Sequence, residues 1–157
     1  MAAIKISHFS DILCIWAYVS EIRIDELCNA FKERIEIEFH LFPVFGNVPG
    51  KISRQWGDRG GLEAYSEHVQ QIAAQFDHLC IDPQVWRTNP PYSSLPAHLY
   101  LSAVRAAEQQ ELIAKGSFLS FKKCLRNAFF RELADISNSA VLSGLAAAEG
   151  LPVSDIE

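Results

Sequence analysis

The chain has 157 residues and a mass of 17.6 kDa, with 49% apolar and 21% charged residues. This length suits one domain with a hydrophobic core, and the apolar content excludes an intrinsically disordered chain. The 14 basic and 19 acidic residues leave a net charge of −5, which argues against nucleic-acid or anionic-membrane partners. No run of residues is long and apolar enough to predict a membrane span.

The first 46 residues predict a βαβ unit. Ile4 to Phe9 is a short apolar run with β-branched residues, which predicts a strand. Apolar residues at helical spacing predict one helix from Ile15 to Phe31, and residues 35–42 alternate apolar and polar as in a half-buried strand. Strand, helix and strand in this order predict a parallel pair with a right-handed crossover. The N-terminus lacks the pattern of a secretory signal, so we expect a cytoplasmic protein.

Residues 47–150 predict a helical subdomain. Four residues are expected to interrupt regular structure after the second strand, namely Pro43, Gly46, Pro49 and Gly50. Apolar residues then recur at helical spacing in four stretches, 62–76, 96–106, 118–129 and 141–145. We expect Ser137 to cap the last helix and Gly150 to end it.

Residues 151–157 predict the start of a further element. Ser154 and Glu157 have the spacing of a capping box, and Pro152 fits a break before a new helix. An accidental match in a frayed tail is the alternative. We interpret this segment as the beginning of a return toward the first unit.

Four cysteines are candidate reactive groups, namely Cys14, Cys28, Cys80 and Cys124. None belongs to a Cys-x-x-Cys pair, so neither a disulfide framework nor a zinc spacing is present, and a buried, inert thiol is the default for each. A conceivable metal cluster of His68, His78 and Cys80 lacks a recognised spacing, and we expect no metal. Cys14 differs because it lies at the start of a predicted helix, where backbone N–H groups and the helix dipole stabilise a thiolate.

Residues 9–18, Phe-Ser-Asp-Ile-Leu-Cys-Ile-Trp-Ala-Tyr, resemble the active-site turn of the DsbA-like thioredoxin superfamily. The branch with FrnE-like oxidoreductases, 2-hydroxychromene-2-carboxylate isomerases and kappa-class glutathione transferases has Ser-Asp-x-x-Cys-Pro-Trp-Cys-Tyr or Ser-Pro-x-Ser-Tyr here. Residues 43–46, 91–98 and 128–137 resemble later segments of that branch in the same order. The resemblance implies an α/β fold, with a thioredoxin-like βαβ unit over 1–46 and a large all-helical insertion over 47–150.

The sequence departs from the family pattern in three places. The second cysteine is replaced by Ala17, and the proline between the two cysteines by Ile15. Cys28 lies about 21 Å farther along the predicted helix, at 1.5 Å per residue, so it cannot replace the missing partner. The second thioredoxin half, with its cis-proline loop, is not found before Glu157, so we expect an incomplete thioredoxin-like domain.

The resemblance therefore implies a thiol–disulfide oxidoreductase that works through Cys14 alone. Its thiolate would attack a disulfide, and an external thiol such as glutathione would resolve the mixed disulfide. The alternatives are a glutathione-dependent isomerase or transferase and a non-catalytic binding protein on the same fold. Ser10, Asp11, Ile15 and Trp16 are the expected substrate or glutathione contacts, with a structural cap as the alternative for Ser10 and Asp11. We expect a small thiol or disulfide as partner, no tightly bound cofactor, and leave a homodimer open.

Overall fold

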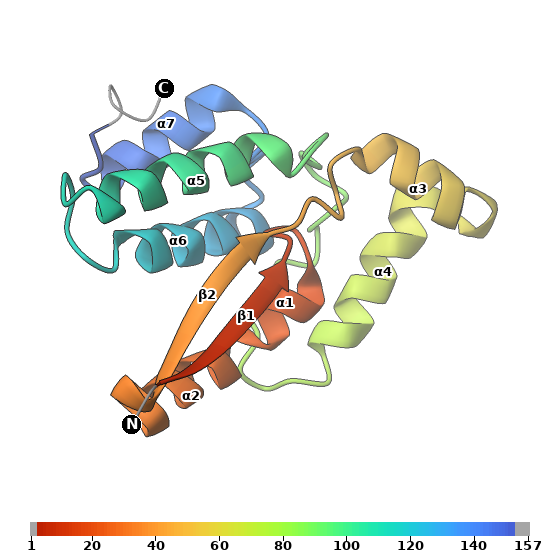
Figure 1. Ribbon diagram of the computed structural model, residues 1–157. Coiled ribbons are helices and arrows are strands. Elements are labelled where there is room, and N and C mark those ends of the chain that lie inside the picture. Colours follow the sequence, from red (N-terminus) through yellow and green to blue (C-terminus); the bar gives the residue numbers. More distant parts are fainter. Residues whose placement is uncertain (1–2, 153–157) are drawn as a thin grey trace.

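The computed structural model describes residues 3–152 of the chain. The elements follow in the order β1 (Ile4–Ser10), α1 (Ile15–Val19), α2 (Glu21–Phe31), η1 (Lys32–Arg34), β2 (Ile35–Leu41), α3 (Val48–Trp56), η2 (Gly57–Arg59), α4 (Gly61–Ala73), α5 (Leu95–Gln109), α6 (Ser117–Glu132) and α7 (Ser139–Ala148) (Figure 1). The predicted capping box at Ser154 and Glu157 lies outside the described residues. The helices of the described part are too short or too polar to cross a membrane.

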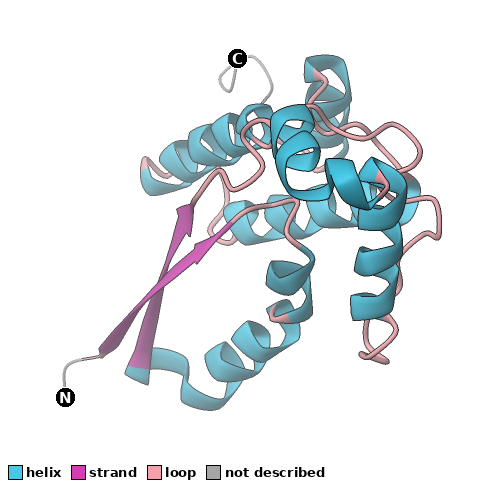
Figure 2. Cartoon of the chain, turned by 90° about the vertical axis from the view of Figure 1, so that its right-hand side faces the viewer, coloured by secondary structure: helices cyan, strands magenta, loops and turns pink. Residues whose placement is uncertain are grey.

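The two strands form a parallel pair, as the strand–helix–strand order predicts. Ile4 is in register with Ile35 and Ser10 with Leu41, so the two strands match along their whole length. In the described part of the chain β1 pairs with β2 on one side only (Figure 2). Both strands point their carboxyl ends toward the loops that lead into α1 and α3, so this edge of the sheet gathers residues 11–14 and 42–47 (Figure 1).

The single helix predicted from Ile15 to Phe31 is wrong, because the chain breaks it at Ser20. The Ser20 hydroxyl donates to the carbonyl of Ala17 at 3.1 Å, and α2 begins at Glu21. A serine hydroxyl that bonds a nearby carbonyl competes with the regular helical pattern, which explains a break at this residue. Cys28 lies on α2 and not on the helix that Cys14 precedes, so a separation based on one straight helix does not apply.

Two predicted helix boundaries also need correction. Pro49 and Gly50 do not interrupt the chain but lie in the first turn of α3, where Asn47 caps the helix by accepting from the Gly50 N–H at 2.9 Å. Proline fits a first turn because its missing N–H is not needed there. The cap of α7 is Asn138, whereas the Ser137 hydroxyl lies against Asp135. The expected stop is confirmed, since Gly150 has φ +71° just after α7.

The hydrophobic core lies among the helices and not around the sheet. One cluster of buried residues runs from Ile12 to Leu151, and its large, fully buried members include Val69, Trp86, Leu101, Phe121, Leu125 and Phe129. In Figure 1, α5, α6 and α7 stack beside β2, while α3 and α4 form a pair on the other side of the molecule. No described residue of β1, α2 or β2 is buried.

Candidate active site

The candidate site is the turn between β1 and α1, residues 11–14, at the carboxyl end of the sheet. Cys14 is the N-cap of α1, with an extended backbone of φ −81° and ψ 120°. Its N–H donates to the Asp11 carbonyl at 3.2 Å, and its own carbonyl accepts from the Tyr18 N–H at 3.1 Å. The thiol is half-buried and makes no capping hydrogen bond. The sulfur therefore lies where the first N–H groups of the helix lack intrahelical partners.

The other cysteines differ from Cys14 in their surroundings. All four are free thiols, but Cys28 and Cys80 are exposed, so the expectation that each cysteine is buried is wrong for these two. Cys124 is half-buried on α6. Burial, as the main cause, together with the nearby carboxylates of Glu149 and Glu132, raises the pKa of its thiol to about 11. A thiol with such a pKa carries almost no thiolate at neutral pH, so Cys124 is a poor nucleophile.

Asp11 fixes the turn from inside the protein. It is 1% exposed, and its Oδ1 accepts from the Leu13 N–H at 2.9 Å. Its Oδ2 accepts from the Phe45 N–H at 2.8 Å and from the Ser94 hydroxyl at 2.7 Å. One carboxylate thus joins the turn to the loop after β2 and to the N-cap of α5. Because both oxygens are used internally, Asp11 positions the turn, and its expected contact with a ligand is not supported.

His98 on α5 reaches the same turn. Its Nε2 accepts from the Ile12 N–H at 3.2 Å, which requires a neutral imidazole with its proton on Nδ1. Burial lowers the pKa of His98, as does Arg126, while the Asp11 carboxylate acts in the opposite direction. The 3.7 Å approach of Nε2 to Asp11 Oδ1 is therefore not an ion pair in the neutral state. The turn is held by a buried carboxylate and a buried neutral histidine.

The other expected contact residues divide into buried and exposed. Ile15 is 3% exposed and packs into the core, so its side chain cannot contact a ligand as expected. Ser10 is half-buried at the end of β1, where its carbonyl accepts from the Phe42 N–H at 3.0 Å. Trp16 is 53% exposed, and its ring meets Phe76 edge to face at 6.2 Å between centroids. Trp16 is thus the one expected contact side chain that offers a large apolar surface beside Cys14.

Three residues near the turn, His98, Tyr65 and Ser94, are not among the predicted site residues. Tyr65 on α4 is 7% exposed. Burial is the main cause that raises the pKa of its hydroxyl, and the negative charges of Cys14 and Asp11 raise it further. In the sequence it belongs to the apolar stripe of a helix, which gives no signal for a site. Ser94 had a weak signal, because it lies in the segment 91–98 that resembles the family. Only the fold shows that Ser94 bonds Asp11.

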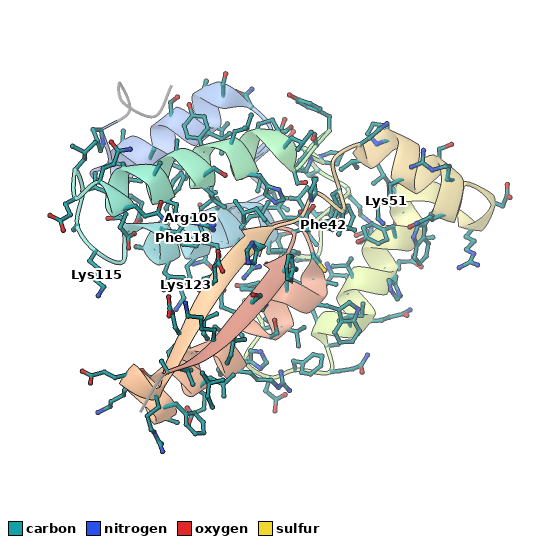
Figure 3. All side chains as sticks on the ribbon, viewed as in Figure 1. Phe42, Lys51, Arg105, Lys115, Phe118 and Lys123 are labelled. Atoms are coloured by element: carbon teal, nitrogen blue, oxygen red, sulfur yellow. The ribbon has the colours of Figure 1, made fainter. Side chains whose placement is uncertain are left out.

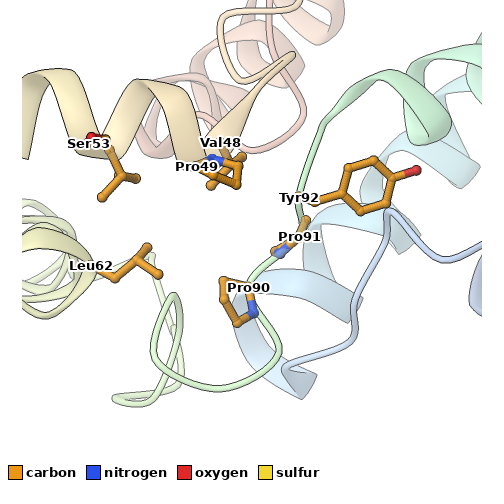
Figure 4. A pocket seen from close by; sticks show the side chains of 8 residues that line it. Val48, Pro49, Ser53, Leu62, Pro90, Pro91 and Tyr92 are labelled. Carbon is orange, nitrogen blue, oxygen red and sulfur yellow. The ribbon is translucent and has the colours of Figure 1, made fainter.

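An apolar pocket of about 380 Å³ lies between α3, the start of α4 and the proline-rich loop, and Cys14 is not part of its lining (Figure 4). Its lining residues are Val48, Pro49, Ile52, Ser53, Leu62, Pro90, Pro91 and Tyr92. Its lining has no cysteine, histidine or charged side chain, and most of it is apolar, so it can hold an apolar group. Within residues 3–152, no three His, Cys, Asp or Glu side chains come together as metal ligands.

Comparison with known proteins establishes the fold. No family model matches the chain, and no curated protein matches it in sequence. Among solved structures, a candidate protein disulfide isomerase from Nitrosomonas europaea superposes with a TM-score of 0.69 at 15% identity, covering 98% of this chain and 68% of that one. The cytosolic disulfide reductase DsbM from Pseudomonas aeruginosa gives 0.68 at 16% identity, covering 98% and 69%. Its structure with GSH gives 0.66 at 16% identity, covering 98% and 70%. The chain therefore shares its fold with these disulfide isomerase and disulfide reductase structures, in agreement with the fold that the resemblance of its motifs implies.

Proposed function

We propose that this protein is a thiol–disulfide oxidoreductase that uses Cys14 as its only nucleophile and glutathione as the external thiol. The observation that carries the proposal is the placement of a free, half-buried thiol at the N-cap of α1, in a turn fixed by Asp11 and His98. The shared fold with a disulfide reductase that was also solved with GSH supports it. We also propose a reducing compartment, where free cysteines persist.

The chemistry needs one thiol on the protein. The Cys14 thiolate attacks a glutathione mixed disulfide at the glutathione sulfur, forms a Cys14–glutathione disulfide and releases the substrate as a thiolate. A second glutathione thiolate then attacks the glutathione sulfur of that adduct. Glutathione disulfide leaves, and the Cys14 thiolate is regenerated. In the net reaction the mixed disulfide and one glutathione thiol become the substrate thiol and glutathione disulfide, so one disulfide is exchanged for another and the electrons balance without a second protein cysteine.

The direct test is to treat the full chain with glutathione disulfide and map the adduct by peptide mass spectrometry. We expect one glutathione on the peptide that holds Cys14, and none there in Cys14→Ser. The turnover of a glutathione mixed disulfide, followed through glutathione reductase and NADPH, should fall to background in Cys14→Ser. Cys28→Ser is the matched control, because Cys28 is an exposed thiol outside the turn and its loss should leave turnover unchanged. Turnover that survives in Cys14→Ser would overturn the proposal.

A glutathione-dependent isomerase or transferase is the second candidate. The observation that favours it is the neighbour solved with GSH, since a protein of this fold can hold that molecule. Saturable binding of glutathione by calorimetry, with no adduct on Cys14 and no disulfide turnover, would select this function over the first. Absence of both glutathione binding and turnover would leave the third expectation, a non-catalytic binding protein.

A further inference from the structure

Three successive amides lead into the thiol, and each has a hydrogen-bond partner. The Cys14 N–H donates to the Asp11 carbonyl at 3.2 Å, and the Leu13 N–H donates to Asp11 Oδ1 at 2.9 Å. The Ile12 N–H donates to His98 Nε2 at 3.2 Å. Two of these bonds come from within the turn, whereas the third reaches across 86 residues of sequence to α5. Asp11 thus holds the N–H groups of Leu13 and Cys14, and His98 holds the N–H of Ile12.

The backbone that carries the imidazole is firmly placed. His98 is 5% exposed, and its backbone N–H donates to the Ser94 carbonyl at 3.0 Å in the first turn of α5. Its carbonyl accepts from the Ser102 hydroxyl at 2.8 Å. Ser94 in turn bonds Asp11, so the start of α5 and the turn are joined twice. A rigid acceptor on α5 can therefore set the conformation of the turn.

We propose that neutral His98 is a positioning residue for the thiol turn, because its Nε2 accepts from the Ile12 N–H and so fixes the peptides that lead to Cys14. This inference rests on the proposed function for its role in catalysis, but the conformation of the turn can be measured without turnover. His98 does not touch the sulfur in this arrangement. It acts through the backbone that carries Cys14.

Protonation of His98 would reverse this arrangement. A protonated Nε2 is a donor and cannot accept from Ile12, and the nearest acceptor is Asp11 Oδ1 at 3.7 Å. That oxygen already accepts from Leu13, so the charged imidazole would compete with the Leu13 N–H for it. The charged groups that act on His98 are Asp11 in the turn and Arg126 on α6. Tyr65 on α4 is the titratable group that senses Asp11 and Cys14 from the other side.

The test measures each cysteine of the full-length chain by a pulse of isotope-coded iodoacetamide between pH 5 and pH 9. In the wild type we expect the rate at Cys14 to fall more steeply than a single thiol titration allows once His98 is protonated, at a pH that burial shifts below the ordinary histidine pKa of about 6.5. In His98→Gln, whose side-chain oxygen can accept from Ile12 but cannot titrate, the profile should reduce to a single titration. Cys28, an exposed thiol on α2 outside the turn, is the internal control and should react alike in both proteins.

A second readout separates the turn from catalysis. Amide hydrogen exchange should show Ile12 at least about tenfold less protected in His98→Leu, which has no acceptor, and near wild-type protection in His98→Gln. Phe45, held by Asp11, should stay protected in both variants. An unchanged Ile12 in His98→Leu, or a wild-type pH profile in His98→Gln, would overturn the inference. Absence of disulfide turnover in the wild-type chain, with both readouts as expected, would refute only the proposed function.

Discussion

The sheet unit and the helical region of this molecule bury their side chains very differently. In the helical region, α4, α5 and α6 contain residues such as Val69, Leu101 and Phe121 that are fully buried. In the sheet unit, made of β1, α2 and β2, no described residue is buried, and Ile4 and Phe9 are 67% and 65% exposed. Parallel strands are usually covered on both faces. The helices thus supply the hydrophobic stability, and the sheet carries the turn that holds the thiol.

Ion pairs contribute to the attachment of the sheet unit to the helices. The Glu21 carboxylate on α2 accepts from Arg126 at 2.8 Å and lies 3.3 Å from the Lys122 ammonium, both cations being buried on α6. The Lys122 ammonium also lies 4.4 Å from the centroid of the Phe39 ring on β2. Phe118, also on α6 and labelled in Figure 3, has its ring centroid 6.0 Å from that of Phe39, and Lys123 lies 2.7 Å from Asp25 on α2. This junction depends on charge as well as on apolar packing, so it should respond to different substitutions from the core.

The largest expected difference is in the free energy of unfolding lost when a phenylalanine is replaced by alanine in each of the two regions. Phe121→Ala removes a ring that is 0% exposed on α6, and we expect the free energy of unfolding to fall by about 3–5 kcal/mol. Phe9→Ala removes the same ring from β1, where it is 65% exposed, and should cost less than about 0.5 kcal/mol. Urea unfolding followed by circular dichroism measures both. A cost at Phe9 as large as at Phe121 would mean that the sheet is covered in solution and would break the comparison.

The second largest loss of stability is expected at the ion pairs that join α2 to α6. Glu21→Gln leaves two buried cations without their carboxylate, and we expect a loss of about 3 kcal/mol in the free energy of unfolding. Asp25→Asn on the same helix is the matched control. Its partner Lys123 lies at 2.7 Å, but the two side chains are 47% and 44% exposed, so the cost should be below about 1 kcal/mol. Equal costs for the two variants would show that burial does not govern this junction.

The sequence predicts the elements of both regions better than it predicts how they meet. The strands and most helices follow from the alternation over residues 35–42 and the helical stripes, because these patterns are local. The break at Ser20 is missed, since apolar spacing continues through it and a single serine hydroxyl decides the outcome. Buried and exposed cysteines look alike in sequence, which is why the exposure of Cys28 and Cys80 was not foreseen.

The candidate site shows the same limit more sharply. Cys14 is identifiable because a cysteine before a helical stripe has a local signal. The partners of Asp11 are not, because Ser94 lies 83 residues away and His98 lies 86 residues from Ile12. Tyr65 has the spacing of a core residue, and its electrostatic link to Cys14 depends on how α4 packs against α1. Long-range polar contacts are set by the whole fold, so one sequence gives no direct signal for them.

The smallest expected effect is on the pH dependence of the free energy of unfolding. It can be compared between one histidine of the helical region and one of the sheet unit. Burial lowers the pKa of His98 on α5 and, with the charges of Lys122 and Arg126, that of His8 on β1. Each histidine therefore binds a proton more tightly in the unfolded chain, whose histidines titrate near pH 6.5, so the free energy of unfolding should fall as the pH drops below about 6.5. Urea unfolding at several pH values between 5 and 7.5 measures this slope. His98→Gln should flatten it more than His8→Gln, because His98 is 5% exposed and the sheet unit leaves His8 only half-buried. A larger effect at His8 would place the more protected histidine in the sheet unit, contrary to the difference in burial between the two regions.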